Sequence, residues 1–129
     1  MIIDAPKYRG KQEYLLVYAE LINAARHRGT LTYQEVAEIM GLPLRGSHMG
    51  AETSRLLGEI SQEEHEHGRP MLSALVVSTA GSPGAGFFHL ARHLGKLQVA
   101  TPAEEQPFWE QEKEAVYAAW KTVPKPPVP

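Results

Sequence analysis

Residues 29–50 read GTLTYQEVAEIMGLPLRGSHMG and carry the clearest local signals in the chain. Thr32 followed three residues later by Glu35 forms a capping box, in which each side chain accepts a hydrogen bond from the other residue's backbone N–H at a helix start. Gly41 and then Pro43 are stop signals, because glycine adopts the left-handed conformation of a helix end and proline cannot continue a helix. This stretch therefore predicts a short, sharply bounded helix followed by a turn.

Apolar residues recur at steps of three and four on both sides of this short helix, which covers residues 33–40. The first pattern predicts a helix over residues 11–28, ended by Gly29. The second predicts a helix that starts near Ser47 and stops before Pro70, since proline interrupts the hydrogen bonds of a helix. Three helices in this order, with the second one short, are typical of a helix-turn-helix.

The next part of the chain predicts a β-hairpin. Residues 71–77 are apolar and β-branched near their end, which favours a strand. Residues 78–86 are rich in glycine and serine and are expected to form the turn. Phe87 and Phe88 would then begin or join the second strand.

Two more helices complete the expected fold, a brief one over residues 89–94 and a longer one over residues 107–121. We therefore predict an α+β, mostly α fold, a winged helix-turn-helix made of three helices plus a β-hairpin, with an added C-terminal helix. Residues 1–121 would form this single domain, and residues 122–129 a flexible proline-rich tail. The residues expected in its core include Val36, Ala37, Met40, Leu57, Ile60, Leu75 and Val77.

Composition limits the chemistry. A chain of 129 residues, 43% of them hydrophobic, can bury one core without covalent links. It has no cysteine, which excludes disulfides, thiolate zinc sites and cysteine nucleophiles and permits a reducing compartment. No apolar stretch reaches the length that crosses a bilayer, and the N-terminus lacks the pattern of a leader. We expect a soluble cytoplasmic protein, with no membrane partner and no indicated cofactor.

The charge pattern leaves two interpretations open. A net charge of −2 argues against a strongly electrostatic nucleic-acid binder. However, residues 67–101 contain no Asp or Glu, while Arg69, Arg92 and Lys96 lie among them. This segment could present a mildly basic face, or it could simply carry few charges because it is apolar.

The helix-turn-helix stretch also resembles a known family. It is similar to the DNA-binding domain of the alkylguanine-DNA alkyltransferases and of their cysteine-less alkyltransferase-like relatives. The matching positions are Thr32-Tyr33, Val36-Ala37, Gly41, Pro43 and Gly50. The resemblance implies a winged helix-turn-helix that binds duplex DNA, with Tyr33 in the place of a tyrosine that contacts the DNA backbone.

The chain differs from that family at the residues that carry out alkyl transfer. Met71 follows Pro70 where the family has its reactive cysteine, and a thioether cannot become a thiolate nucleophile. Leu72 and Ser73 follow where the family has histidine and arginine. Ser47 aligns with the arginine that enters the base stack, so base flipping by that route is not implied either. Alkyl transfer by the family mechanism is excluded, which favours a non-enzymatic role but leaves other catalysis open.

Three function classes follow. The leading hypothesis is a non-catalytic winged helix that binds DNA weakly or as an accessory factor, through Tyr33, Arg45, Ser47, Arg55, Arg69 and Arg92. The alternative is a protein-interaction or oligomerisation domain, such as a homodimer, that uses the aromatic C-terminal helix through Trp109, Val116 and Trp120.

The third hypothesis is a metal-assisted hydrolase built on Glu63, Glu64 and His67, because imidazole and carboxylate ligate zinc and manganese. The spacing is poor for this purpose. On a helix only Glu63 and His67, four residues apart, share a face. A solvated helix end explains the same residues more simply, and we expect no metal site there.

Overall fold

The computed structural model describes residues 5–44, 46–98 and 101–121, and within them it is mostly helical with one small sheet. Arg45 and the proline-rich tail, residues 122–129, lie outside the described residues. The elements are, in order, α1 (Gln12–Arg26), β1 (Leu31–Thr32), α2 (Tyr33–Met40), α3 (Ser47–Glu66), the 3₁₀ helix η1 (Leu72–Leu75), β2 (Val76–Val77), α4 (Ala85–His93) and α5 (Pro102–Trp120). None of the described helices is both long and apolar enough to cross a membrane.

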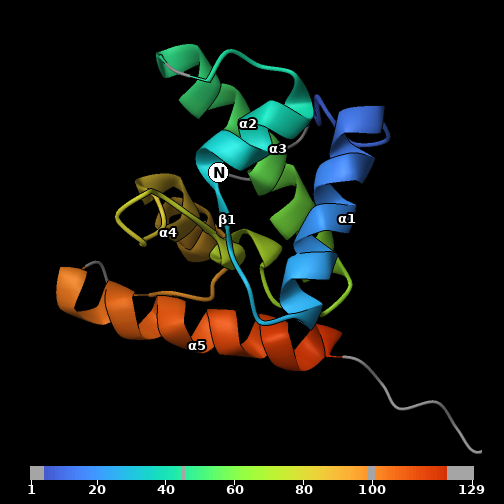
Figure 1. Cartoon of the computed structure of the whole chain (residues 1–129). Coiled ribbons are helices and arrows are strands. Elements are labelled where there is room, and N and C mark those ends of the chain that lie inside the picture. Colours follow the sequence, from blue (N-terminus) through green and yellow to red (C-terminus); the bar gives the residue numbers. More distant parts are fainter. Residues whose placement is uncertain (1–4, 45, 99–100, 122–129) are drawn as a thin grey trace, which may run out of the picture.

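The helices surround the short buried element η1. In Figure 1, α1, α2 and α3 form one group, α4 lies beside α3, and α5 runs across the base of the molecule. η1 packs against α1, α3 and α5, so it is the point at which the N-terminal and C-terminal helices meet. The core is continuous around it and includes residues of every helix.

The predicted helix over residues 33–40 is confirmed as α2, together with its caps. Thr32 Oγ1 accepts a hydrogen bond from the Glu35 N–H at 3.1 Å, and Glu35 Oε1 accepts one from the Thr32 N–H at 2.9 Å. Gly41 ends the helix in the left-handed conformation, with φ of 75°. The flanking helices α1 and α3 also match their predicted positions closely.

The predicted hairpin is wrong. β1 and β2 pair in parallel, with Leu31 opposite Val76 and Thr32 opposite Val77. The strand expected over residues 71–77 is mostly the 3₁₀ helix η1, and only its last two residues are extended. The described residues therefore contain no antiparallel hairpin that could act as a wing.

Tertiary hydrogen bonds explain why residues 71–75 need no strand partner. The Met71 N–H donates to Glu112 at 2.9 Å, the Ser73 N–H donates to Ser61 Oγ at 3.1 Å, and Ala74 O accepts from Trp109 Nε1 at 2.8 Å. These partners satisfy buried backbone groups that would otherwise need a sheet. An apolar run without alternation does not by itself distinguish a strand from a buried helical turn.

The second half of the expected hairpin is also helical. Phe87 and Phe88 belong to α4, which starts at Ala85, earlier than the predicted helix over residues 89–94. Phe87 packs its ring against Phe108 of α5, with 5.9 Å between the ring centroids. Gly84 precedes the first turn, so the glycine-rich turn is real but ends where α4 begins.

The C-terminal helix α5 is longer than predicted and packs into the core. It begins at Pro102 rather than residue 107, and Pro107 is an exposed residue inside it. Trp109 and Val116, predicted to contact a partner, are buried within this chain instead. Trp109 donates a hydrogen bond to Ala74 O of η1, and α5 packs against both η1 and α1.

The expected core residues are buried, except for Met40. Val36, Ala37, Leu57, Ile60, Leu75 and Val77 are all below a tenth exposed, whereas Met40 is only partly buried at the edge of the core. Met40 is the last residue of α2, where the helix meets solvent.

Replacing Leu57 by alanine should lower the free energy of unfolding by about 2 to 5 kcal/mol, because it removes a buried side chain and leaves a cavity. Leu15→Ala is the matched control, since Leu15 is 60% exposed on α1. Urea unfolding followed by circular dichroism measures both. Equal losses for the two variants would show that Leu57 is not in the core.

Candidate functional site

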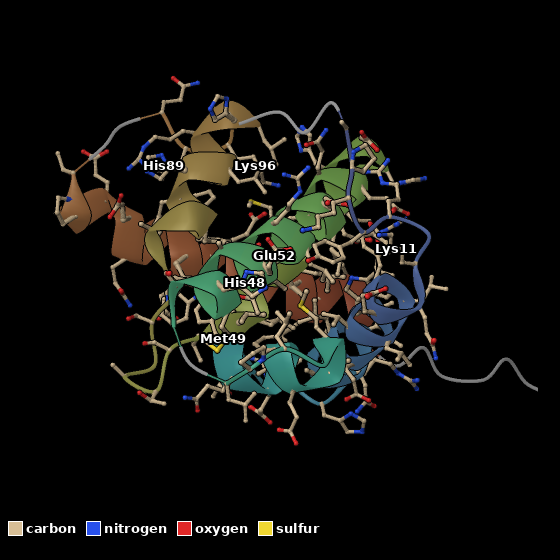
Figure 2. The ribbon with its side chains drawn as sticks, turned by 90° about the horizontal axis from the view of Figure 1, so that it is seen from above. Lys11, His48, Met49, Glu52, His89 and Lys96 are labelled. Atoms are coloured by element: carbon tan, nitrogen blue, oxygen red, sulfur yellow. The ribbon has the colours of Figure 1, made fainter. Side chains whose placement is uncertain are left out.

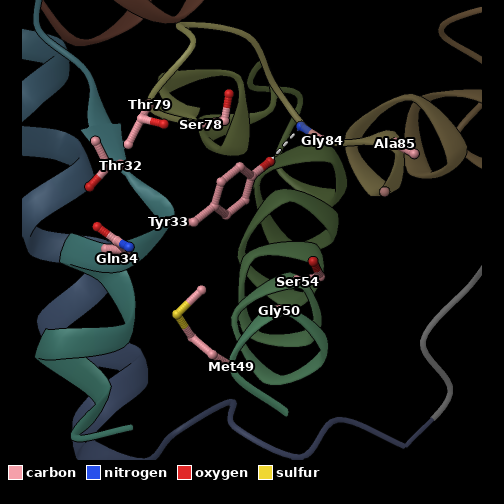
Figure 3. Close-up of a pocket in the computed structure, with 11 residues that line it drawn as sticks. Thr32, Tyr33, Gln34, Met49, Gly50, Ser54, Ser78, Thr79, Gly84 and Ala85 are labelled. Atoms are coloured by element: carbon pink, nitrogen blue, oxygen red, sulfur yellow. Dashed lines mark hydrogen bonds between the residues drawn. The ribbon is translucent and has the colours of Figure 1, made fainter. Parts of the chain in front are cut away.

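A pocket of about 390 Å³ opens where α2, α3, α4 and the loop before α4 meet. Figure 3 shows Tyr33 in its centre, with Met49 and Ser54 of α3 on one side and Ser78 and Thr79 above. The lining residues are Thr32, Tyr33, Gln34, Met49, Gly50, Ser54, Ser78, Thr79, Gly84, Ala85 and Gly86. This list contains hydroxyls, an amide and a thioether but no charged side chain.

Tyr33 occupies this pocket because the capping box sets the start of α2. Its hydroxyl oxygen accepts a hydrogen bond from the Gly84 N–H at 2.7 Å, drawn as a dashed line in Figure 3. Burial raises the pKa of Tyr33, and the Gly84 N–H partly opposes that rise. The phenol therefore stays neutral and keeps a proton with which it can donate a hydrogen bond.

Gly84 leaves space for this close approach. A Cβ on Gly84 would lie 3.1 Å from the Tyr33 hydroxyl oxygen, which is tighter than ordinary contact. Its φ of −77° is open to any residue, so the demand for glycine here comes from space rather than from backbone conformation. The glycine-rich loop thus serves to let the backbone reach the tyrosine.

The described lining of this pocket consists of neutral side chains and glycines. Nucleophilic catalysis needs a base within hydrogen-bond reach of the nucleophile, and no histidine or carboxylate lines the pocket beside Ser54, Ser78 or Thr79. The neutral hydrogen-bond donors and acceptors that line the pocket suit an uncharged polar group of a ligand.

The predicted nucleic-acid residues do not lie together. Tyr33 and Ser47 belong to this end of the molecule, and Ser47 is exposed at the first position of α3. Arg69 lies beyond the opposite end of α3, and Arg92 lies near the end of α4. Arg45 is outside the described residues.

Arg69 and Arg92 are engaged by glutamates. Arg69 makes two hydrogen bonds to the fully buried Glu64, at 2.7 and 3.0 Å, and this carboxylate raises the pKa of Arg69. Arg92 pairs with Glu105 at 2.5 Å. The mildly basic face suggested by residues 67–101 is therefore largely neutralised by glutamates from other parts of the chain.

The predicted interaction residues make intramolecular contacts. Trp109 and Val116 are in the core, and Trp120 lies under Arg69, whose guanidinium is 5.4 Å from its ring centroid. Such a cation–π contact holds the end of α5 against the segment that follows α3.

The residues of the metal hypothesis have structural partners. Glu63 accepts from the Tyr14 hydroxyl at 2.6 Å, Glu64 binds Arg69, and His67 Nδ1 lies 2.9 Å from the carbonyl oxygen of Glu63. Among the residues that the structure describes, no three histidine or acidic side chains are grouped so that they could hold a metal ion.

Several pocket residues were not singled out from the sequence. Gln34, Met49 and Ser54 come from two helices, and Ser78 and Thr79 come from the loop. The adjacency of Tyr33 to a glycine-rich loop carried no local signal, because the two are 51 residues apart in sequence. Comparison with protein-family models, with curated proteins and with solved structures found no match to this chain. The resemblance to alkyltransferase-like domains thus stays a prediction.

Gly84→Ala should lower the free energy of unfolding by about 1 to 3 kcal/mol, because its methyl group displaces Tyr33 from a packed position. Gly86→Ala is the control, because its Cβ would lie 3.9 Å from Ser54 Oγ and alanine favours a helix. Urea unfolding measures stability, and the Tyr33 ring resonances report the displacement. If both variants are equally stable, Gly84 does not set the position of Tyr33.

Proposed function

We propose that this chain is a non-catalytic module that binds duplex DNA through the first two turns of α3. The observation that carries the proposal is the exposed start of α3, which follows the capped helix α2 in the chain as the second helix of a helix-turn-helix does. Ser47 and His48 are exposed there, and the first turn contains no acidic residue.

The physical chemistry of this end of α3 supports phosphate contacts. The first N–H groups of a helix have no partner within the helix and carry partial positive charge. Gly46 precedes Ser47 with φ of 95° and offers no side chain that could cap them. Backbone N–H groups and serine hydroxyls are common donors to DNA phosphates. Binding of this kind positions a protein on DNA and gives modest affinity.

The two other hypotheses have less support. Trp109 and Val116 have little surface left for a second copy, because they are buried in their own chain. A metal-assisted hydrolase would need Glu63, Glu64 and His67 to leave their present partners. The wing of a winged helix would have to come from an element other than the predicted hairpin.

Ser47→Glu should weaken binding to a labelled duplex by about tenfold at low salt, because a carboxylate would face the phosphates. The fold should persist, since a negative charge at a helix N-terminus is stabilising. Fluorescence anisotropy measures the affinity, and its dependence on salt should report only a few phosphate contacts.

Ala118→Glu is the matched control, because it adds the same charge at an exposed position on α5. It should leave the affinity close to that of the wild type. The proposal fails if the wild type shows no binding at low salt, or if the two glutamate variants weaken binding equally.

A further inference from the structure

Residues 5–10 form a strap that lies along one side of α3. Figure 2 shows the N-terminal segment, in blue, passing beside α3 near Glu52. The strap ends in a turn in which the Lys11 N–H donates to Tyr8 O at 2.9 Å, just before α1 begins. Tyr8 is buried, so the strap is part of the packed structure.

One buried carboxylate holds the backbone of the strap. Glu59 is fully buried and accepts hydrogen bonds from three consecutive N–H groups, those of Lys7 at 2.8 Å, Tyr8 at 2.9 Å and Arg9 at 2.9 Å. Successive N–H groups that converge in this way form a binding site for a negative charge.

The side chains of the strap bind other carboxylates of α3. Lys7 Nζ lies 2.5 Å from Glu52, and the Tyr8 hydroxyl donates to the same carboxylate. These two bonds lower the pKa of Glu52, the Lys7 bond more strongly. Arg9 pairs at 3.5 Å with Glu63 and at 3.5 Å with Glu66.

In most of these pairs the positively charged side chain is more exposed to solvent than the carboxylate. The Lys7 side chain is 47% exposed and that of Glu52 only 15%. Arg55, which also donates to Ala5 O, is 45% exposed over a Glu59 that is 0% exposed. The pair of Arg9 with Glu63 shows the same order, and Glu66 at the far end of α3 is the exception.

We propose that the docked strap converts this acidic side of α3 into a cation-bearing surface, and that this surface contacts the phosphate backbone of a nucleic acid next to Ser47. Lys7 and Arg55 supply its positive charge on the side of Ser47, and Arg9 adds to it toward the other end of α3, beside Glu63 and Glu66. This inference rests on the function proposed above and extends it, since it adds a second contact surface and makes binding depend on the docking of the strap.

Electrostatics gives the reason for that dependence. Without the strap, α3 would present Glu52, Glu59 and Glu63 to the phosphates, and like charges at short range repel. The cations of a released strap would no longer be held at fixed positions, and ordering them on DNA would cost conformational entropy. The docked state is therefore the state that binds.

Glu59→Gln tests the proposal, because the effect expected from charge alone has the opposite sign. Removing a negative charge should tighten binding to DNA, but an amide places a donor where the Lys7 N–H needs an acceptor. We expect the strap to be released and the affinity to fall by about tenfold at low salt. Glu20→Gln is the control, since Glu20 is exposed on α1 and the change in charge is the same.

Hydrogen exchange of the Lys7, Tyr8 and Arg9 amides reports docking without DNA. These amides should be protected in the wild type and unprotected in Glu59→Gln, while the amides of α5 stay protected. Tyr8→Phe keeps the buried ring and removes only the bond to Glu52, so it supplies a second, milder variant that should weaken binding less.

The outcomes separate the claims. If the strap amides stay protected in Glu59→Gln, Glu59 does not hold the strap. If they lose protection while affinity is unchanged or higher than that of Glu20→Gln, the strap does not form the contact surface. If hydrogen exchange of the strap amides changes as expected but the wild type binds no duplex, the function proposed above is wrong. The proposed contact surface is then wrong too.

Discussion

The carboxylates of α3 point toward the N-terminal part of the chain, and each of them has donors there. Glu59 binds the backbone of residues 7–9, Glu63 accepts from Tyr14, and Glu64 accepts from Tyr18 as well as Arg69. A buried carboxylate without such partners would cost several kcal/mol, as an order of magnitude. Removing these donors would therefore leave α3 unable to pack in its present position, and α1 and the strap depend on the same bonds.

The pairing of acidic with basic side chains also limits which surface groups can bind a ligand. The arginines that would make a basic face, Arg69 and Arg92, are paired with glutamates and lie away from the start of α3. What remains near the start of α3 is a neutral pocket around Tyr33, an uncapped helix N-terminus and the outward cations of the strap. The proposed contact with nucleic acid uses the helix N-terminus and these cations, which agrees with the modest affinity expected of an acidic chain.

Local signals in the sequence were sufficient for α2, because its capping box and Gly41 act within a few residues. Contacts distant in sequence were not predictable from one chain. The end of α3 was interpreted as solvated, yet Glu64 is fully buried because its donors come from α1 and from beyond the helix. The prediction of a hairpin was wrong for the same reason, because the segment that contains η1 has its hydrogen-bond partners on α3 and α5. Of the pocket residues, Thr32, Tyr33 and Gly50 were part of the family resemblance, but only Tyr33 was given a binding role, and Gly84 was expected only as part of a turn.

Spectrophotometric titration of the phenols tests the role of the α3 carboxylates most directly. Burial and hydrogen bonds to Glu52, Glu63 and Glu64 raise the pKa values of Tyr8, Tyr14 and Tyr18, that of Tyr8 to about 12. A free tyrosine titrates near pH 10. Because these pKa values are higher in the folded state, their contribution to stability is present below about pH 10 and is lost as the pH rises through the folded values. Absorbance at the phenolate band should stay flat through pH 10 and rise only above it, as Tyr8 ionises near pH 12 or the fold is lost. Ionisation of several tyrosines at pH 10, with the fold intact, would contradict this account.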